Sequence, residues 1–271
     1  MTESADKSKT GLVNSLTATL VNPRNWWGYV VLLLGVLLVL AIIYDPRYTE
    51  AFNFILPGVV MTLGLTVISF CIALVIGLFM GLSRVSSNRF LYNFSTFYVE
   101  TIRGVPILVQ ILYVAFVIFP AIVDLLNSLG AQTSIRDVEM YVRAILGLAI
   151  AYGAFEAEVF RAGIQSIERG QMEAARSLGM TYIQAMRYVI LPQAIRRVLP
   201  PIGNDFVAML KDTSLASVLA VREITQLSNL QRARSFTTFE PLNVASFLYL
   251  SSTLLLTRVV RYLERRLSPD E

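Results

Sequence analysis

The sequence predicts an all-α, polytopic membrane protein with about six transmembrane helices. Hydrophobic residues make up 55% of the 271 residues and charged residues only 15%, whereas an ordinary soluble domain carries about 25% charged residues. The mean hydropathy is +0.60. The charges are also clustered, and the uncharged runs between them are long enough to cross a bilayer. These observations exclude an ordinary soluble domain.

The first 44 residues predict a tail followed by one membrane helix. Residues 1–27 are polar with scattered apolar positions and end at Trp26 and Trp27. This pattern is typical of a cytoplasmic tail that forms an interfacial helix, and a disordered tail is the alternative. Residues 28–44 carry no charge and predict an additional N-terminal transmembrane helix. A signal peptide is the other interpretation of this run, but no small-residue cleavage pattern follows it, so we expect the helix to be retained.

Five further spans are expected within residues 56–265, which we interpret as one transmembrane domain. These spans are expected near residues 57–82, 104–123, 141–163, 202–217 and 242–257, with polar connections at 84–100, 124–142 and 218–241. The span at 202–217 is short and polar, so we expect an interrupted helix that lines a water-filled route. Glycines along the span at 57–82 offer small faces for close helix contact, namely Gly58, Gly64, Gly77 and Gly81.

Residues 170–192 form a charged, helix-favouring segment between two spans, here called the 170–192 loop. We expect a first helix from Gln171 to about Leu178, because Gly179 can adopt the positive φ that ends a helix. A second helix is expected from about Tyr182 to near Pro192, since the residue before a proline is disfavoured in the helical region. The segment 193–201 should then turn the chain back into the membrane.

The distribution of basic residues predicts the orientation in the membrane. If six spans leave both termini in the cytoplasm, 16 lysines and arginines face inward and seven face outward. The positive-inside rule therefore favours cytoplasmic termini and places the 170–192 loop in the cytoplasm. The net charge of +4 is explained by this topology and does not indicate nucleic-acid binding.

Polar side chains inside the expected spans are the candidates for a substrate route, because such groups are costly in lipid unless they have partners or water. The alternative is a structural role, with Glu158–Arg161 and Lys211–Asp212 as ion pairs. The six candidates are Gln110, Glu156, Glu158, Asn204, Asp205 and Thr213.

Several kinds of chemistry are absent from the sequence. The chain has no histidine and one cysteine, Cys71, so no imidazole–metal site, histidine-based triad or intrachain disulfide is expected. No Gly-x-x-x-x-Gly-Lys-Ser/Thr phosphate loop occurs, because none of the three lysines follows the required glycines. We therefore expect neither a metal site nor an enzymatic activity in this chain.

The 170–192 loop resembles the EAA motif of permeases of ATP-binding cassette (ABC) importers. Glu173-Ala-Ala is followed after three residues by Gly179 and then by Leu191-Pro192, with Val189 where the motif has isoleucine. Two further segments resemble permeases of the polar amino acid branch, which includes histidine, glutamine and arginine importers. These are Arg103-Gly-Val-Pro-Ile-Leu-Val-Gln110 and Lys211-Asp-Thr-Ser-Leu215.

This resemblance implies a five-helix type I importer core to which 28–44 adds a helix, in the inner membrane of a bacterial cell. It implies that the 170–192 loop couples transport to an ATPase through Glu173, Ala174, Ala175, Gly179, Leu191 and Pro192. It also implies three partners: a separate ATP-binding subunit that holds ATP, a second permease that is identical or paralogous, and an extracytoplasmic amino-acid-binding protein. No cofactor is expected in this chain itself.

The alternative function is an ion-gradient-driven secondary transporter of small polar solutes. Such a transporter is expected to show inverted repeats, and the sequence shows no convincing internal repeat. An intramembrane enzyme has less support, because no nucleophile–base pair is visible.

Overall fold

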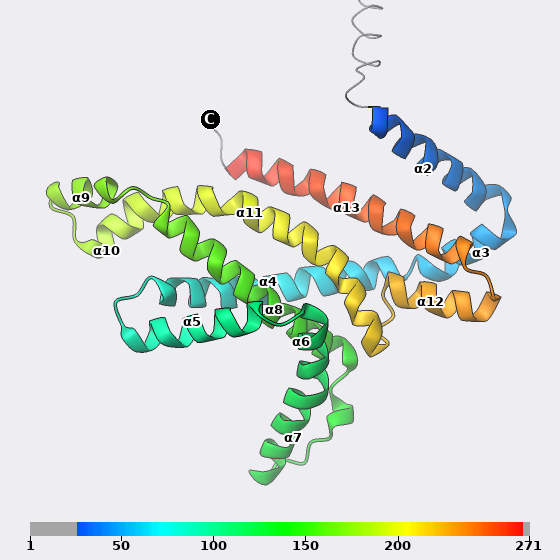
Figure 1. Cartoon of the computed structure of the whole chain (residues 1–271), viewed down its shortest axis with the longest axis horizontal. Helices are drawn as coiled ribbons and strands as arrows, with labels where there is room; N and C mark the ends of the chain where they lie inside the picture. The colour runs from blue at the N-terminus through cyan, green and yellow to red at the C-terminus, as the bar shows by residue number, and fades with distance from the viewer. Residues whose placement is uncertain (1–25, 268–271) are drawn as a thin grey trace, which may run out of the picture.

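The computed structural model describes residues 26–267, and this part of the chain contains helices and no strand (Figure 1). The predicted all-α fold is confirmed, whereas nearly all of the predicted 1–27 tail lies outside the described residues. The elements are α2 (Trp26–Tyr44), α3 (Pro46–Ile55), α4 (Gly58–Arg84), α5 (Arg89–Arg103), α6 (Ile107–Tyr113), the π-helical η2 (Val114–Ile118), α7 (Phe119–Ser128), the 3-10 helix η3 (Ile135–Asp137), α8 (Met140–Gln165), α9 (Arg169–Ser177), α10 (Tyr182–Ala185), the π-helical η4 (Met186–Ile190), α11 (Leu191–Asp212), the 3-10 helix η5 (Thr213–Leu219), α12 (Ile224–Ser235) and α13 (Phe239–Leu267).

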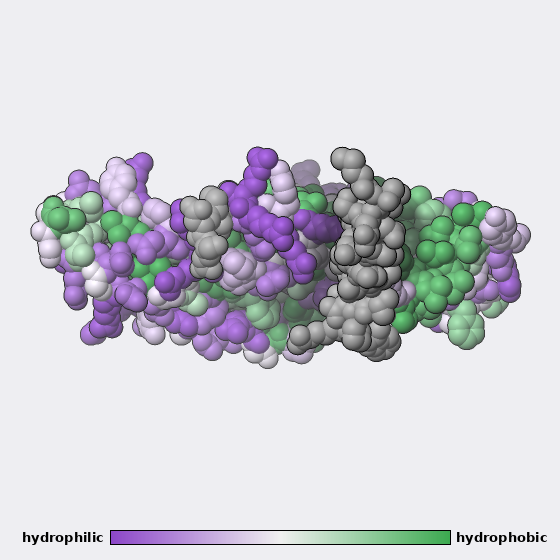
Figure 2. All heavy atoms as spheres, turned by 90° about the horizontal axis from the view of Figure 1, so that it is seen from above, coloured by the Kyte–Doolittle hydropathy of each residue, from purple (hydrophilic) through white to green (hydrophobic). Residues whose placement is uncertain are grey.

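Among the described residues, three helical stretches are long and apolar enough to cross a membrane: 46–84, 107–128 and 239–266. The apolar helix at 28–44 is shorter. Helices α8 and α11 are also of spanning length, but both carry charged residues. Figure 2 shows an apolar region toward one end of the molecule, flanked along the long axis by more polar surface.

Helices α4 and α8 run parallel and pack closely through the glycines of α4. A Cβ atom added to Gly77 would lie 2.4 Å from the Cβ of Glu156, and one added to Gly81 would lie 2.8 Å from the carbonyl oxygen of Ala157. Real Cβ atoms essentially never approach other atoms so closely, so glycine is what permits the contact. The predicted small-residue face of this span is confirmed.

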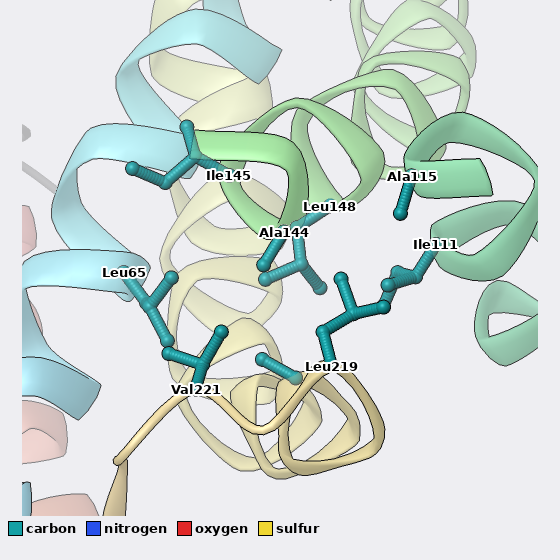
Figure 3. Packing of buried hydrophobic residues seen from close by; sticks show 9 residues of the cluster. Leu65, Ile111, Ala115, Ala144, Ile145, Leu148, Leu219 and Val221 are labelled. Atoms are coloured by element: carbon teal, nitrogen blue, oxygen red, sulfur yellow. The ribbon is translucent and has the colours of Figure 1, made fainter. Parts of the chain in front are cut away.

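A hydrophobic cluster joins α4, α6, α8, η5 and the short segment between η5 and α12 (Figure 3). Leu65, Ile111 and Leu148 are completely buried within it. Leu219 and Val221 reach the same cluster from the chain that precedes α12. The N-terminal half of the bundle is therefore bound to the chain that follows α11.

Two predicted polar connections fold as helices, which the sequence analysis did not anticipate. The segment at 84–100 holds most of α5, which buries Ser95 and Val99 and whose Tyr98 hydroxyl donates to the Ile150 carbonyl at 2.6 Å. The segment at 218–241 holds α12, whose first turn is capped by the Glu223 carboxylate. Helix α5 is amphipathic and α12 is polar. Their charged residues indicated a surface segment, whereas each helix buries one face against elements that are distant in the sequence.

The predicted end of a helix near Pro192 is wrong. The π-helical η4 leads directly into α11, which continues through Pro192, Pro200 and Pro201 to Asp212. A π-helical turn changes the local hydrogen-bond register, which accommodates a proline that lacks an N–H donor. The predicted interruption of the span at 202–217 has a counterpart, because the α-helix changes to the 3-10 helix η5 at Thr213.

The two ends of the molecule differ in structure (Figure 1). Helices α9 and α10 form one end, and α12 with the α2–α3 turn forms the other. The long helices α11 and α13 extend between these ends.

We expect the substitution Gly77→Ala to destabilise the protein by about 1–3 kcal/mol, because the added methyl group overpacks the α4–α8 contact. The apparent melting temperature of the detergent-purified protein should fall in a size-exclusion assay. Gly35→Ala is the matched control, since Gly35 lies in the apolar helix α2 with no atom within 4 Å of an added Cβ. Equal melting temperatures for the two variants would contradict the packing argument.

Candidate functional site

The 170–192 loop folds as two short helices joined by a sharp turn. Helix α9 ends at Ser177, and Gly179 two residues later has a φ of +83°, in the region that favours glycine. The Met180 amide donates to the Ala175 carbonyl at 3.2 Å and closes the turn. Helix α10 begins at Thr181, whose hydroxyl accepts from the Gln184 amide at 3.3 Å. These hydrogen bonds make the loop a defined helix–turn–helix unit.

The residues predicted to couple the chain to an ATPase lie on both sides of this turn. Glu173 and Ala174 are exposed on α9, whereas Ala175 is buried. Leu191 and Pro192 are exposed at the start of α11. The unit thus presents most of these residues to a partner while one alanine packs against the rest of the chain.

The base of the helix–turn–helix unit is packed against the ends of α8 and α11. Ile167, Ile190 and Ala194 form a small buried cluster there. The Arg197 guanidinium donates to the Ser166 carbonyl at 2.5 Å, which joins α11 to the end of α8. Displacement of the unit would therefore move α11.

The tip of the unit exposes apolar side chains to its surroundings. Leu178 is 81% exposed and Ile183 is 75% exposed. Figure 2 shows apolar atoms at the surface of this otherwise polar end. Such an exposed apolar patch, rimmed by charged residues, is typical of a protein-interaction surface.

A network of ion pairs joins three helices near the same end. Arg84 of α4 contacts Glu158 of α8 at 2.8 Å and Glu100 of α5 at 3.2 Å. Arg161 Nε also donates to the Glu158 carboxylate at 3.0 Å. The predicted Glu158–Arg161 pair is confirmed, and Arg84 and Glu100 are additional members that were not expected.

Glu156 is the most unusual of the candidate route residues. Its side chain is completely buried, and neither carboxylate oxygen has a hydrogen-bond partner among the described residues. Asp205 of α11 lies close enough to interact with it electrostatically. The structure therefore brings together two predicted candidates, both acidic, from α8 and α11. A ligand cation would stabilise this arrangement.

Tyr152 links these acids to a third one. Tyr152 lies one α-helical turn before Glu156 on α8. Its hydroxyl donates to the Asp212 carboxylate of α11 at 2.8 Å. Lys211 forms no ion pair with Asp212 within residues 26–267, so the predicted structural pair is absent. Tyr152 was not expected at the site, because a tyrosine in an apolar span carries no signal that identifies its partner.

Three predicted candidates lie away from these acids or serve the backbone. The Gln110 amide donates to the carbonyls of Ile102 and Val105 at 2.7 Å each, which stabilises the break between α5 and α6. The Thr213 hydroxyl donates to the Leu210 carbonyl at 2.7 Å where α11 becomes 3-10 helical. Asn204 is exposed.

The described residues contain no cluster of side chains suited to hold a metal ion.

Comparisons with known proteins agree on one family. The family model described as "Binding-protein-dependent transport system inner membrane component" matches residues 73–269. The glutamine transport system permease GlnP of Escherichia coli is 35% identical over 217 residues, which cover 80% of this chain and 94% of GlnP. The arginine permease ArtQ of Bacillus subtilis is 30% identical over 218 residues, with the same coverages.

Solved structures show the same relationship. A crystal structure described as an amino acid ABC transporter with histidines matches with a TM-score of 0.67 and 36% identity, covering 81% of this chain and 95% of that one. The MetNI methionine ABC transporter matches with a TM-score of 0.63 and 18% identity over 79% of this chain and 96% of that one, which shows the fold alone. The chain belongs to the family of binding-protein-dependent transport system inner membrane components.

Proposed function

We propose that this chain is the permease subunit of an ATP-driven ABC importer for polar amino acids in a bacterial inner membrane. One observation carries the proposal: an exposed helix–turn–helix unit with the EAA motif stands at one end of a bundle of membrane-length helices. The names of the relatives, which include glutamine and arginine permeases, support amino acids as the cargo. They do not favour an ion-gradient-driven transporter.

The proposed complex contains a separate ATP-binding subunit that binds ATP, a second permease that is identical or paralogous, and an extracytoplasmic binding protein. The absence of a phosphate loop in the sequence supports the need for an ATPase partner. The excess of basic residues on one side supports cytoplasmic termini and a cytoplasmic 170–192 loop.

The coupling step of this proposal uses the continuity of α11. Closure of the ATPase subunits would displace the α9–α10 unit, and the buried cluster at its base would pass the displacement to α11. Because α11 continues from Leu191 to Asp212, the movement would reach Asp205 and the Tyr152–Asp212 hydrogen bond directly. Alternating access requires ATP to favour one of two such arrangements.

The substrate route of this proposal passes the acids on α8 and α11. Glu156 and Asp205 are both acidic, and no lysine or arginine forms an ion pair with either among the described residues. A cationic side chain or an α-ammonium group would supply the missing positive charge. We therefore propose a preference for cationic amino acids.

The coupling proposal predicts that Gly179→Val reduces uptake by about tenfold or more. A β-branched side chain at a positive φ costs about 1–3 kcal/mol, so the turn that presents the tip should be lost. Uptake of labelled amino acid by cells that express the complete complex is the measurement, with membrane insertion checked by immunoblot. Gly170→Val should stay within about twofold of wild type, because Gly170 also has open space but no positive φ. Normal transport by Gly179→Val would refute the role of the turn.

The substrate proposal predicts that Glu156→Gln lowers uptake of arginine about tenfold more than uptake of glutamine, since the amide keeps the shape and removes the charge. Competition assays in proteoliposomes measure the two uptake rates. Asp124→Asn is the control, because Asp124 is an exposed acid on α7. Its replacement should leave the ratio of arginine uptake to glutamine uptake unchanged. Equal losses for both amino acids would assign Glu156 a structural role.

A further inference from the structure

The turn between α12 and α13 lies at the end of the molecule opposite α9 and α10 (Figure 1). If α9 and α10 are cytoplasmic, as proposed above, this turn faces the extracytoplasmic side. Its most prominent residue is Phe236, whose side chain is 95% exposed. An aromatic ring that packs against almost nothing in its own chain is available to a partner.

The backbone at Phe236 is in an uncommon conformation. Its φ of 54° and ψ of 23° lie in the left-handed region, where a bulky residue is a genuine outlier. Glycine or asparagine usually ends a helix in this way, and either would serve the turn without the steric strain. Because the ring is exposed, burial within the chain does not compensate for the strain. Strain of this kind is concentrated at functional sites.

The turn is held rigidly beneath the ring. The Ser235 hydroxyl donates to the Gln231 carbonyl at 2.8 Å and lies 2.8 Å from the Thr237 hydroxyl. The Arg234 guanidinium lies 5.6 Å from the ring centroid of Phe54 on α3. These contacts fix the backbone of the turn before any partner arrives, so only the side-chain rotamer of Phe236 remains to be ordered on binding.

The surface around Phe236 is polar and contains unpaired positive charge. Arg232, one turn before Phe236, is half-buried and donates to the Asn229 side chain at 3.3 Å, whereas the exposed Arg222 lies at the far end of α12. Neither arginine forms an ion pair within the described part of the chain. Helix α12 itself is polar, with Asn229 exposed. This setting suits water and a soluble protein better than the hydrocarbon of the membrane.

A crevice of about 1010 Å³ opens beside α12 on the same end. Arg222 and Leu230 line it from the side of α12, Phe54 from α3, and Glu139 and Tyr141 from the start of α8. The guanidinium of Arg234, two residues before Phe236, lies over the Phe54 ring at the edge of this crevice, so a protein docked on the α12–α13 turn would stand beside the opening.

We propose that Phe236 is the anchor on which the extracytoplasmic amino-acid-binding protein docks. The ring enters an apolar pocket of that protein, and carboxylates around the pocket pair with the arginines of α12. Central aromatic residues with charged surroundings are typical of binding hot spots. This inference rests on the proposed function, because it needs the binding protein as a partner.

The test uses the complete complex in nanodiscs with whichever purified amino-acid-binding protein of the same bacterium stimulates its ATP hydrolysis. For Phe236→Ala we expect the concentration of liganded binding protein that gives half-maximal stimulation to rise about tenfold. Basal ATP hydrolysis should not change. Phe90→Ala is the control, since Phe90 is 75% exposed on α5, and its half-maximal concentration should equal that of the wild type.

The variant Phe236→Gly separates docking from folding. It should weaken docking as Phe236→Ala does, while its melting temperature equals or exceeds that of the wild type because the strain is removed. A fall in melting temperature, or loss of permease assembly on size exclusion, would assign Phe236 to the structure of the permease and overturn the proposal.

A membrane-anchoring role is tested with Phe236→Trp in a background where Trp26 and Trp27 are replaced by phenylalanine. We expect the tryptophan emission to shift to the blue when the liganded binding protein is added and to resist quenching by brominated lipids. Quenching without the binding protein would overturn the proposal.

If no binding protein stimulates ATP hydrolysis by the wild-type complex, the proposed function itself fails. If the Phe236 variants are stimulated at the same concentration as the wild type, only the docking site is refuted.

Discussion

The contact between α4 and α8 is the constraint on which the rest of the structure depends. Gly77 and Gly81 let the two backbones approach so closely that Glu156 is buried between them without a hydrogen-bond partner. A carboxylate in such a position is costly unless a positive charge reaches it. Helix α11 also packs against α8, and its Asp205 lies within electrostatic range of the buried acid. Close packing thus creates the chemical feature that a transported cation would satisfy.

Helix α11 connects this acidic region to the exposed helix–turn–helix unit. Its N-terminal end shares a buried cluster with that unit, and its C-terminal end carries the acid that binds Tyr152. The proline-containing stretch in the middle does not break the helix. A continuous helix transmits a displacement over its length better than two helices joined by a turn would, so the fold suits mechanical coupling.

The two ends of the molecule expose apolar groups in different ways. At the α9–α10 end, Leu178 and Ile183 stand on a turn made by a glycine, which adopts its positive φ without strain. At the α12–α13 end, Phe236 adopts a comparable conformation with strain. The first turn uses the residue that local geometry favours, whereas the second retains an aromatic ring despite the local cost. Both ends therefore expose apolar side chains on turns with a positive φ.

The sequence by itself determined the features that depend on composition and on neighbours along the chain. These are the all-α membrane class, the small face of α4, the Glu158–Arg161 pair and the glycine turn after α9. Only the tertiary structure decided which faces of α5 and α12 are buried, that Gln110 serves a helix break, and that Glu156 is buried within electrostatic range of Asp205. The physical reason is that helical periodicity and turn preference act over a few residues, whereas the burial and pairing of a charge depend on a distant helix.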